Sequence, residues 1–171
     1  MQRVIQVLFI ILLSGALSAC GFHLREPQVF SPELETVYIN TTTPNDPFIQ
    51  TFIRTLTANN VTVVNDPKQA TATVNILNIQ SSSTMMAGGG MNISGAYVAS
   101  LTVNFSVTNR QGQTLIAPRA VQQSQNFMSN ATQVLSGAST VNQLTSQMDQ
   151  NLADQIMLQL SKIKAPSESA T

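Results

Sequence analysis

Charged side chains are scarce in this sequence, because Asp, Glu, Lys and Arg make up only 9% of its 171 residues. Eight basic and eight acidic residues give a net charge of zero at pH 7. A nucleic-acid-binding domain carries a basic patch or stripe, whereas the basic residues here are scattered along the chain. Nucleic acid is therefore excluded as the expected partner.

Histidine and cysteine occur only once each, as His23 and Cys20. A metal site needs several converging ligands, and a serine nucleophile needs a base to activate it. Asp149 and Asp154 are five positions apart, which places them on different faces of a helix. The glycine run at residues 88–90 lacks the lysine and the helix start of a phosphate-binding loop. We expect no catalytic site, no metal site, no cofactor and no enzyme activity.

Long hydrophobic runs are also missing: the apolar run at residues 4–13 is too short to span a bilayer, which takes roughly 20 residues. It follows a basic Arg3 and precedes small residues, as in a secretory signal peptide. Leu17-Ser18-Ala19-Cys20 resembles a bacterial lipobox, whose cysteine becomes the acylated first residue of the mature protein. The alternative is a free thiol near an ordinary cleavage site, although a single cysteine in an exported chain has no intramolecular partner.

Lipidation at Cys20 predicts a stable membrane anchor, because two acyl chains hold a protein at a membrane where one does not. The residue after it is Gly21, and a non-acidic residue there accompanies transfer to the outer membrane in similar lipoproteins. We therefore predict a chain anchored by lipid to the periplasmic side of the cell outer membrane. The predicted organisation is a signal peptide (1–19), a lipidated N-terminus and linker (20–34), one domain (35–165) and a flexible tail (166–171).

Two long stretches carry no charge at all, residues 69–109 and residues 120–148. Their polarity comes from Ser, Thr, Asn and Gln. A free domain usually keeps charge on its surface for solubility, whereas the cores of protein interfaces are depleted in charge. Two interpretations stay open: a surface that a partner covers, or a host whose secreted proteins are generally rich in Asn, Gln and Thr.

The first half of the domain predicts a strand, a helix and a second strand. Alternation marks a strand at residues 36–40. Asp46 can cap a helix that Pro47 begins, and apolar residues then recur at helical spacing until residues 59–60. A short strand follows at residues 61–64. Strands this close around one helix indicate a crossover unit.

Alternating apolar and polar residues predict three further strands, at residues 72–80, 97–108 and 114–127. Residues 81–94, rich in Ser, Met and Gly, are expected to form a loop. Pro118 forces an edge position or a bulge in the strand that holds it. Apolar residues spaced by three or four predict a final helix that Ser139 caps and that runs to Ile163.

These elements predict an α/β (α+β) two-layer sandwich. Two helices pack on one face of a mixed, mostly antiparallel sheet of four to five strands. Leu101, Val103 and Phe105 are expected to face the helices. Thr102 and Asn104 then belong to the opposite face, which presents uncharged polar side chains.

The hexapeptide Cys20-Gly21-Phe22-His23-Leu24-Arg25 resembles the start of mature proteins of the LptE family. The order of elements from residue 37 to residue 163 is also similar to that family. The resemblance implies an outer-membrane lipoprotein that plugs the LptD β-barrel, assists its assembly and helps to place lipopolysaccharide in the outer leaflet. LptD is thus the expected partner, and lipopolysaccharide a second one. Thr102 and Asn104 are candidates for contact with the barrel.

The resemblance also implies basic residues near the tip of the sheet, but residues 81–94 have no Lys or Arg. Arg110 and Arg119 are expected on the neighbouring hairpin and are the nearest basic candidates, with ordinary solvated side chains as the alternative. The glycine run is flanked by three methionines, Met85, Met86 and Met91. They form either an adaptable apolar surface for a partner or an acyl chain, or simply a flexible hairpin loop.

Two other functions compete with the barrel plug. One is a periplasmic regulatory lipoprotein that activates a cell-wall enzyme, although a linker of roughly ten residues reaches at most about 35 Å. The other is a lipid carrier with its own cavity, for which two helices on a single sheet leave little room.

Overall fold

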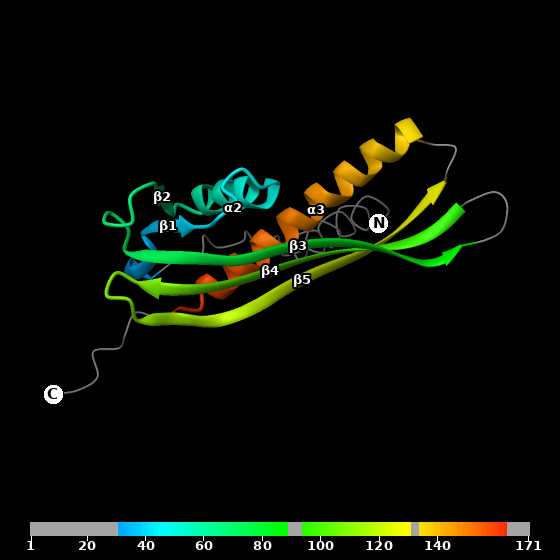
Figure 1. The fold of residues 1–171 in the computed structure, drawn as a ribbon. Coiled ribbons are helices and arrows are strands. Elements are labelled where there is room, and N and C mark those ends of the chain that lie inside the picture. Colours follow the sequence, from blue (N-terminus) through cyan, green and yellow to red (C-terminus); the bar gives the residue numbers. More distant parts are fainter. Residues whose placement is uncertain (1–30, 89–93, 131–133, 164–171) are drawn as a thin grey trace, which may run out of the picture.

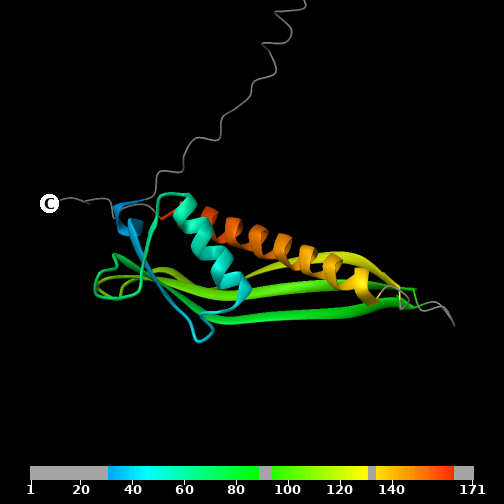
Figure 2. The same cartoon turned by 90° about the horizontal axis from the view of Figure 1, so that it is seen from above.

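The computed structural model describes residues 31–88, 94–130 and 134–163, which form a sheet with two helices on one face (Figures 1 and 2). A short 3-10 turn, η1 (Pro32–Leu34), comes first. The other elements are, in chain order, β1 (Thr36–Asn40), α2 (Pro47–Ala58), β2 (Thr62–Val64), β3 (Ala72–Gly88), β4 (Ser94–Asn109), β5 (Thr114–Asn130) and α3 (Val134–Leu160). This is the predicted two-layer sandwich.

Capping residues determine where α2 begins and ends. Asp46 accepts a hydrogen bond from the backbone N–H of Phe48 at 2.9 Å, and Pro47 occupies the first turn, where an N–H group has no helical partner. Asn59 caps the C-terminus, and Asn60 has a φ of 63°, in the left-handed region that Asn tolerates. Both ends of α2 lie where the sequence predicts them.

The strand order in the sheet is β2-β1-β3-β4-β5. β1 pairs parallel with β2 and with β3, whereas β3, β4 and β5 form an antiparallel meander. The pairing of β1 with β3 ends at Asn40 and Asn75. Beyond that row the described sheet consists of β3, β4 and β5 alone.

This three-stranded part is called the blade here, and it comprises residues 78–88, 94–104 and 120–130. The three segments start at one row, in which Asn104 pairs with both Asn78 and Ala120. The remainder of the described chain, with α2 and the two short strands, is called the root. Figures 1 and 2 show the blade extending past α2, with only the N-terminal half of α3 along it.

The predicted loop at residues 81–94 is wrong for residues 81–88 and 94, and its residues 89–93 lie outside the described part of the chain. β3 continues to Gly88 and β4 begins at Ser94, with paired rows such as Ser81 opposite Leu101 and Ser83 opposite Ala99. The serines show no apolar alternation, but pairing with β4 satisfies their backbone groups. Strand formation here depends on the neighbouring strand more than on the local composition.

The last helix also begins earlier than predicted, at Val134 instead of Ser139. A serine inside a helix costs only a few tenths of a kcal/mol relative to better helix formers, so it is a weak start signal. The described part of the predicted apolar stripe is buried: Leu144, Met148, Leu152, Ile156 and Leu160. Ile163 follows the helix and packs against the core. Among the described residues, no helix has both the length and the hydropathy to cross a bilayer.

Pro118 lies on an edge strand and at a bulge, as the sequence predicts. β5 is the outermost strand on its side of the sheet. Its register jumps from the Val107–Ile116 pair to the Phe105–Arg119 pair. The irregularity holds the proline where no ladder hydrogen bond from its nitrogen is needed.

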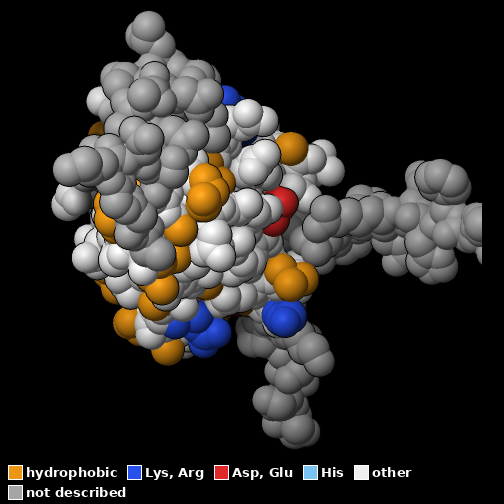
Figure 3. Space-filling view, turned by 90° about the vertical axis from the view of Figure 1, so that its right-hand side faces the viewer, with side chains coloured by type: hydrophobic (Ala, Val, Ile, Leu, Met, Phe, Trp, Pro, Cys, Tyr) orange, Lys and Arg blue, Asp and Glu red, His pale blue; other side chains and the backbone are white. Residues whose placement is uncertain are grey.

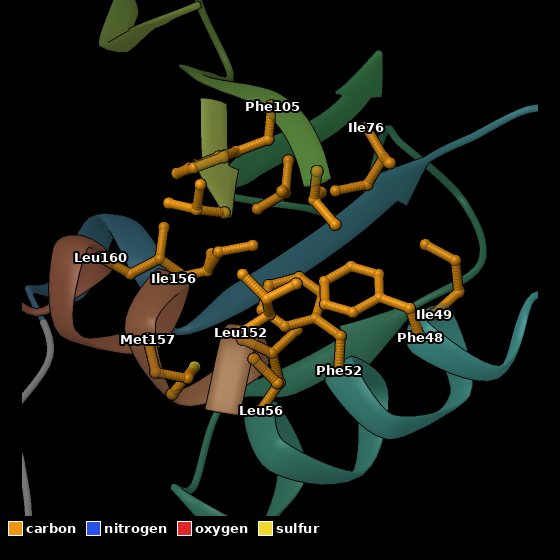
Figure 4. Close-up of a cluster of buried hydrophobic side chains, with 14 of the residues drawn as sticks. Phe48, Ile49, Phe52, Leu56, Ile76, Phe105, Leu152, Ile156, Met157 and Leu160 are labelled. Carbon is orange, nitrogen blue, oxygen red and sulfur yellow. The ribbon is translucent and has the colours of Figure 1, made fainter. Parts of the chain in front are cut away.

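Most of the hydrophobic core lies in the root, between the sheet and both helices (Figure 4), and the core continues under α3 into the blade at Leu101, Val103 and Val121. The rings of Phe48 and Phe52 stack with their centroids 5.9 Å apart. They belong to one cluster with Leu152 and Ile156 of α3 and Phe105 of β4, and all five side chains are fully buried. Burying each such side chain stabilises the fold by about 1.5–3 kcal/mol, so the root carries most of the packing energy.

Candidate functional site

The face of the sheet that points away from the helices is called the open face here. Thr102 and Asn104 lie on it and are partly exposed, since they alternate along β4 with the buried residues Leu101, Val103 and Phe105. This orientation confirms the predicted alternation. The open face is therefore available for contact along the blade.

Polar side chains on the open face bond to one another. Ser100 Oγ and Ser124 Oγ lie 2.9 Å apart across β4 and β5, and the Gln122 amide donates to Ser124 Oγ at 3.4 Å. No residue of the blade is charged. The face consequently presents neutral donors and acceptors, which cost far less to remove from water than ions do.

Two exposed methionines give the far end of the open face an apolar surface. Met86 and Met128 are 68% and 72% exposed. Together with Ala96 and Val98 they line a shallow hollow of about 390 Å³. Figure 3 views this end of the molecule and shows hydrophobic side chains on a surface with few charges. Flexible, polarizable methionines suit a contact that adapts to its partner.

A second hollow, of about 330 Å³, lies on the helix side between the blade and α3. Its apolar lining comes from Leu101, Phe127, Leu144 and Met148, and serines of β3 complete it. The Tyr97 ring stacks on Phe127 with centroids 5.4 Å apart. Met85 pairs with Tyr97 in the ladder and is 49% exposed. Apolar surface is thus accessible on both faces of the blade.

The two candidate arginines lie on the hairpin of β4 and β5, as predicted, but far from the tip of the blade. Arg110 follows β4 at the end opposite Ser94, and a strand of 16 residues is roughly 50 Å long. Its guanidinium donates to the carbonyls of Ala70 at 3.0 Å and Gln69 at 3.4 Å. This bonding gives Arg110 a structural role in the root.

Arg119 pairs with Phe105 and is the first paired residue of β5 after the bulge. Its guanidinium donates to Gln159 Oε1 of α3 at 3.4 Å. It therefore faces the helix layer, whereas Thr102 and Asn104 face away from it. Neither arginine shares a surface with the exposed methionines of the open face.

Asp149 of α3 is a carboxyl group in an unfavourable place, because only 4% of its surface is exposed. Burial, and to a lesser extent the nearby carboxylate of Asp46, raise the pKa of Asp149 to about 6. Both groups lie in the root, at the contact of α3 with the start of α2. The shift is a property of the fold's interior and lies away from the open face.

Sequence analysis missed Val98 and Met128 as candidates. Both occupy the polar side of the alternation, on the same face as Ser100 and Ser124. An apolar residue at such a position is the signal that identifies them. Two predicted candidates, Cys20 and Met91, lie outside the described residues.

Three solved structures share the fold of this chain. A minor lipoprotein from Acinetobacter baumannii has a TM-score of 0.62 at 22% identity, over 75% of this chain and 91% of that chain. Lipoprotein B from Nitrosomonas europaea has a TM-score of 0.66 at 17% identity, over 87% and 94%. Rare lipoprotein B from Shewanella oneidensis has a TM-score of 0.62 at 13% identity, over 74% and 93%. At these identities the likeness establishes the fold alone.

Comparison with curated protein sequences gives no match. The family model for LptE, described as lipopolysaccharide-assembly, matches residues 34–160. This match spans β1 to α3 and includes the whole blade. The chain therefore belongs to the LptE family of lipopolysaccharide-assembly proteins.

Proposed function

We propose that this chain is a lipid-anchored protein of the outer membrane that fills the lumen of the LptD β-barrel. In this role it supports assembly of the barrel and forms part of the translocon that places lipopolysaccharide in the outer leaflet. The observation that carries the proposal is the uncharged open face of the blade, with Thr102 and Asn104 at its base.

The charge pattern fits a lumen better than it fits open water. The interior of a transmembrane barrel is polar, so a plug needs side chains that can form hydrogen bonds. Burying an unpaired ion costs several kcal/mol, and the blade has no ion to bury. Serine, threonine and amide side chains meet both requirements.

The length of the blade also supports this role. Its strands contribute eleven residues each, which corresponds to roughly 35 Å. The apolar band of an outer-membrane barrel is about 25 Å tall. A blade of this length can extend through most of a barrel while the root stays at its periplasmic end.

Contact with lipopolysaccharide is the finer part of the proposal. The blade offers no Lys or Arg for its phosphates, and Arg110 is engaged in the root. Exposed Met85 and Met86 provide apolar surface for acyl chains instead. In this account the chain meets the lipid through hydrophobic contact.

Cys20 supplies the anchor in this proposal. We expect Cys20→Ser to leave the domain folded, because the core of the described chain extends from Leu34 to Ile163. The variant should move from the membrane fraction to the soluble periplasmic fraction. Retention in the membrane in cells that lack LptD would contradict lipid anchoring at this residue.

The decisive experiment is co-purification with a matched pair of variants. A tagged full chain is extracted in detergent, and we expect one large barrel protein to accompany it. Asn104→Asp places a charge on the open face with almost no change in shape, whereas Asn65→Asp makes the same change at an exposed site of the root. The first variant should lose the barrel and the second should keep it.

Two results would overturn the proposal. Equal recovery of the barrel by both variants would show that the open face is not buried in it. Recovery of a cell-wall enzyme in place of any barrel would favour the regulatory lipoprotein.

A further inference from the structure

The outer edge of β5 is unusually open. β5 is the last strand of the sheet, 17 residues long, and no other described strand lies beyond it. An unpaired edge attracts further strands, and proteins usually protect it with charges, prolines or bulges. Here Pro118 and Arg119 protect only the start, and residues 120–130 contain neither proline nor charge.

The sequence of this unprotected segment is chemically symmetric about Ser124. It reads Ala120-Val121-Gln122-Gln123-Ser124-Gln125-Asn126-Phe127-Met128. If two copies pair antiparallel with Ser124 at the centre, each residue meets one of its own kind. The pairs are Gln123 with Gln125, Gln122 with Asn126, Val121 with Phe127, and Ala120 with Met128.

The faces of the sheet agree with this symmetry. Val121 is buried beneath α3, and Phe127 packs at the edge of the same core. A Val121–Phe127 pair across the edge would therefore extend the core from one copy to the next. On the open face, Met128 is 72% exposed, and pairing would place Ala120 of the other copy beside it.

No like charges would meet in this arrangement. Arg119, the nearest ion, would lie opposite Ser129 of the other copy, because pairing about Ser124 joins positions equally far on either side. The flank of α3 above the edge is also neutral, since Gln155 donates to Gln123 at 3.1 Å and Gln159 accepts from Arg119. Directly opposed charges are what destabilises such a pair of strands.

We propose that the edge of β5 is a self-association surface, at which a second copy of this chain adds its own β5 antiparallel about Ser124. The two sheets then continue into one, with the helices of both copies on the same face. Such a contact is isologous, because the same residues serve both copies. It goes beyond the proposed function and concerns chains outside a barrel, because a blade inside the lumen has its edge enclosed.

A contact of this kind is small and therefore transient. One pair of strands buries less than the roughly 1,000 Å² expected of a stable interface. Association should consequently depend on the concentration of the chain. A covalent trap is the appropriate way to detect it.

The test uses the purified full chain with Cys20→Ser and one added cysteine, oxidised before electrophoresis under non-reducing conditions. Opposed residues of an antiparallel pair have Cα atoms about 4.5–5.5 Å apart, within the 4.4–6.8 Å that a disulfide spans. In Ser124→Cys, the added cysteine should therefore lie opposite the same cysteine of the second copy, and the two should form a disulfide-linked dimer. The Cys20→Ser chain without an added cysteine should not.

The register is tested by a second pair of variants. Gln122→Cys alone and Asn126→Cys alone should remain monomeric, because neither residue lies opposite itself. A mixture of the two should form the disulfide dimer. Ser124→Lys should prevent association, which is measured with an amine-reactive cross-linker. The control is Gln50→Lys, which adds a lysine on the exposed surface of α2.

Three outcomes would overturn the proposal: no dimer of Ser124→Cys in a chain with an unchanged unfolding midpoint, a dimer of Gln122→Cys alone as abundant as that of the mixture, or a disulfide to a different protein only. None of them bears on the Asn104→Asp comparison. Failure of self-association and failure of the barrel proposal are therefore distinguishable.

Discussion

The root and the blade are built from the same three long strands, but they differ in what covers them. In the root, both helices close over the sheet, and the aromatic side chains of Phe48, Phe52 and Phe105 have no exposed surface. In the blade one helix lies along one face, and Met86 and Met128 are more than two thirds exposed. A single sheet thus serves two purposes, folding at one end and contact at the other.

The difference arises from where the short elements end. α2 spans only 12 residues, and β1 pairs with β3 no further than Asn75. Beyond that point only α3 covers the sheet, so the side chains on the open face of the blade take no part in core packing. They can then be selected for an uncharged contact surface.

The largest expected effect is the loss of a core ring in the root. Phe105→Ala should lower the free energy of unfolding by about 3–5 kcal/mol, because it leaves a cavity in a fully packed cluster. Phe127→Ala in the partly exposed blade should cost roughly 1–2 kcal/mol. Urea unfolding of both variants measures the two losses in the free energy of unfolding and allows them to be compared. Equal losses would show that the blade is as tightly packed as the root.

The second effect concerns Asp149 and depends on pH. Its pKa is about 6 in the fold, above the ordinary value of 3.8, so the folded state favours the neutral acid. The native chain should lose up to about 3 kcal/mol of stability as pH rises from 4 to 7. Asp149→Asn should remove this loss, stabilising the protein at pH 7 and changing little at pH 4. A stabilisation that is equal at both values would contradict burial of the acid.

The third effect tests the packing of the Tyr97 ring within the blade. A Cβ added at Gly95 would lie 2.9 Å from Cε2 of Tyr97. Gly95→Ala should therefore displace the ring, disturb its stack on Phe127 and cost about 1–2 kcal/mol. Adding Tyr97→Leu removes the clash, so the double variant should lose less than the sum of the single ones. Strict additivity, measured by urea unfolding, would exclude the contact.

The smallest effect is expected at the exposed methionines. Met86→Ala and Met128→Ala should each change the free energy of unfolding by less than about 0.5 kcal/mol, since neither side chain is packed. Recovery of the barrel should fall in the double variant. A stability loss of several kcal/mol would mean that these residues belong to a core.

Much of the root can be read from local sequence. Asp46 and Pro47 start α2 through backbone chemistry that needs no tertiary partner. The alternation of Leu101, Val103 and Phe105 likewise identifies the buried face of β4 where the blade meets the root. Both signals arise within a few residues, so a single sequence contains them.

The far half of β3 cannot be read in the same way. Residues 81–84 are Ser-Ser-Ser-Thr, which fit a loop equally well, and only the pairing with β4 makes them a strand. The location of Arg110 is a related case. It follows β4 in sequence, but the length of that strand separates it from the tip. Both features depend on how strands far apart in the sequence are arranged, so predicting them requires the topology of the sheet.

The most direct test of a blade buried in LptD is site-specific photocross-linking in intact cells. A photoreactive residue replaces Thr102 on the open face of the blade or, as the matched control, Asn65 in the root. We predict a covalent product with the large barrel protein from position 102 and none from position 65. A product from position 65 with none from position 102 would contradict the account.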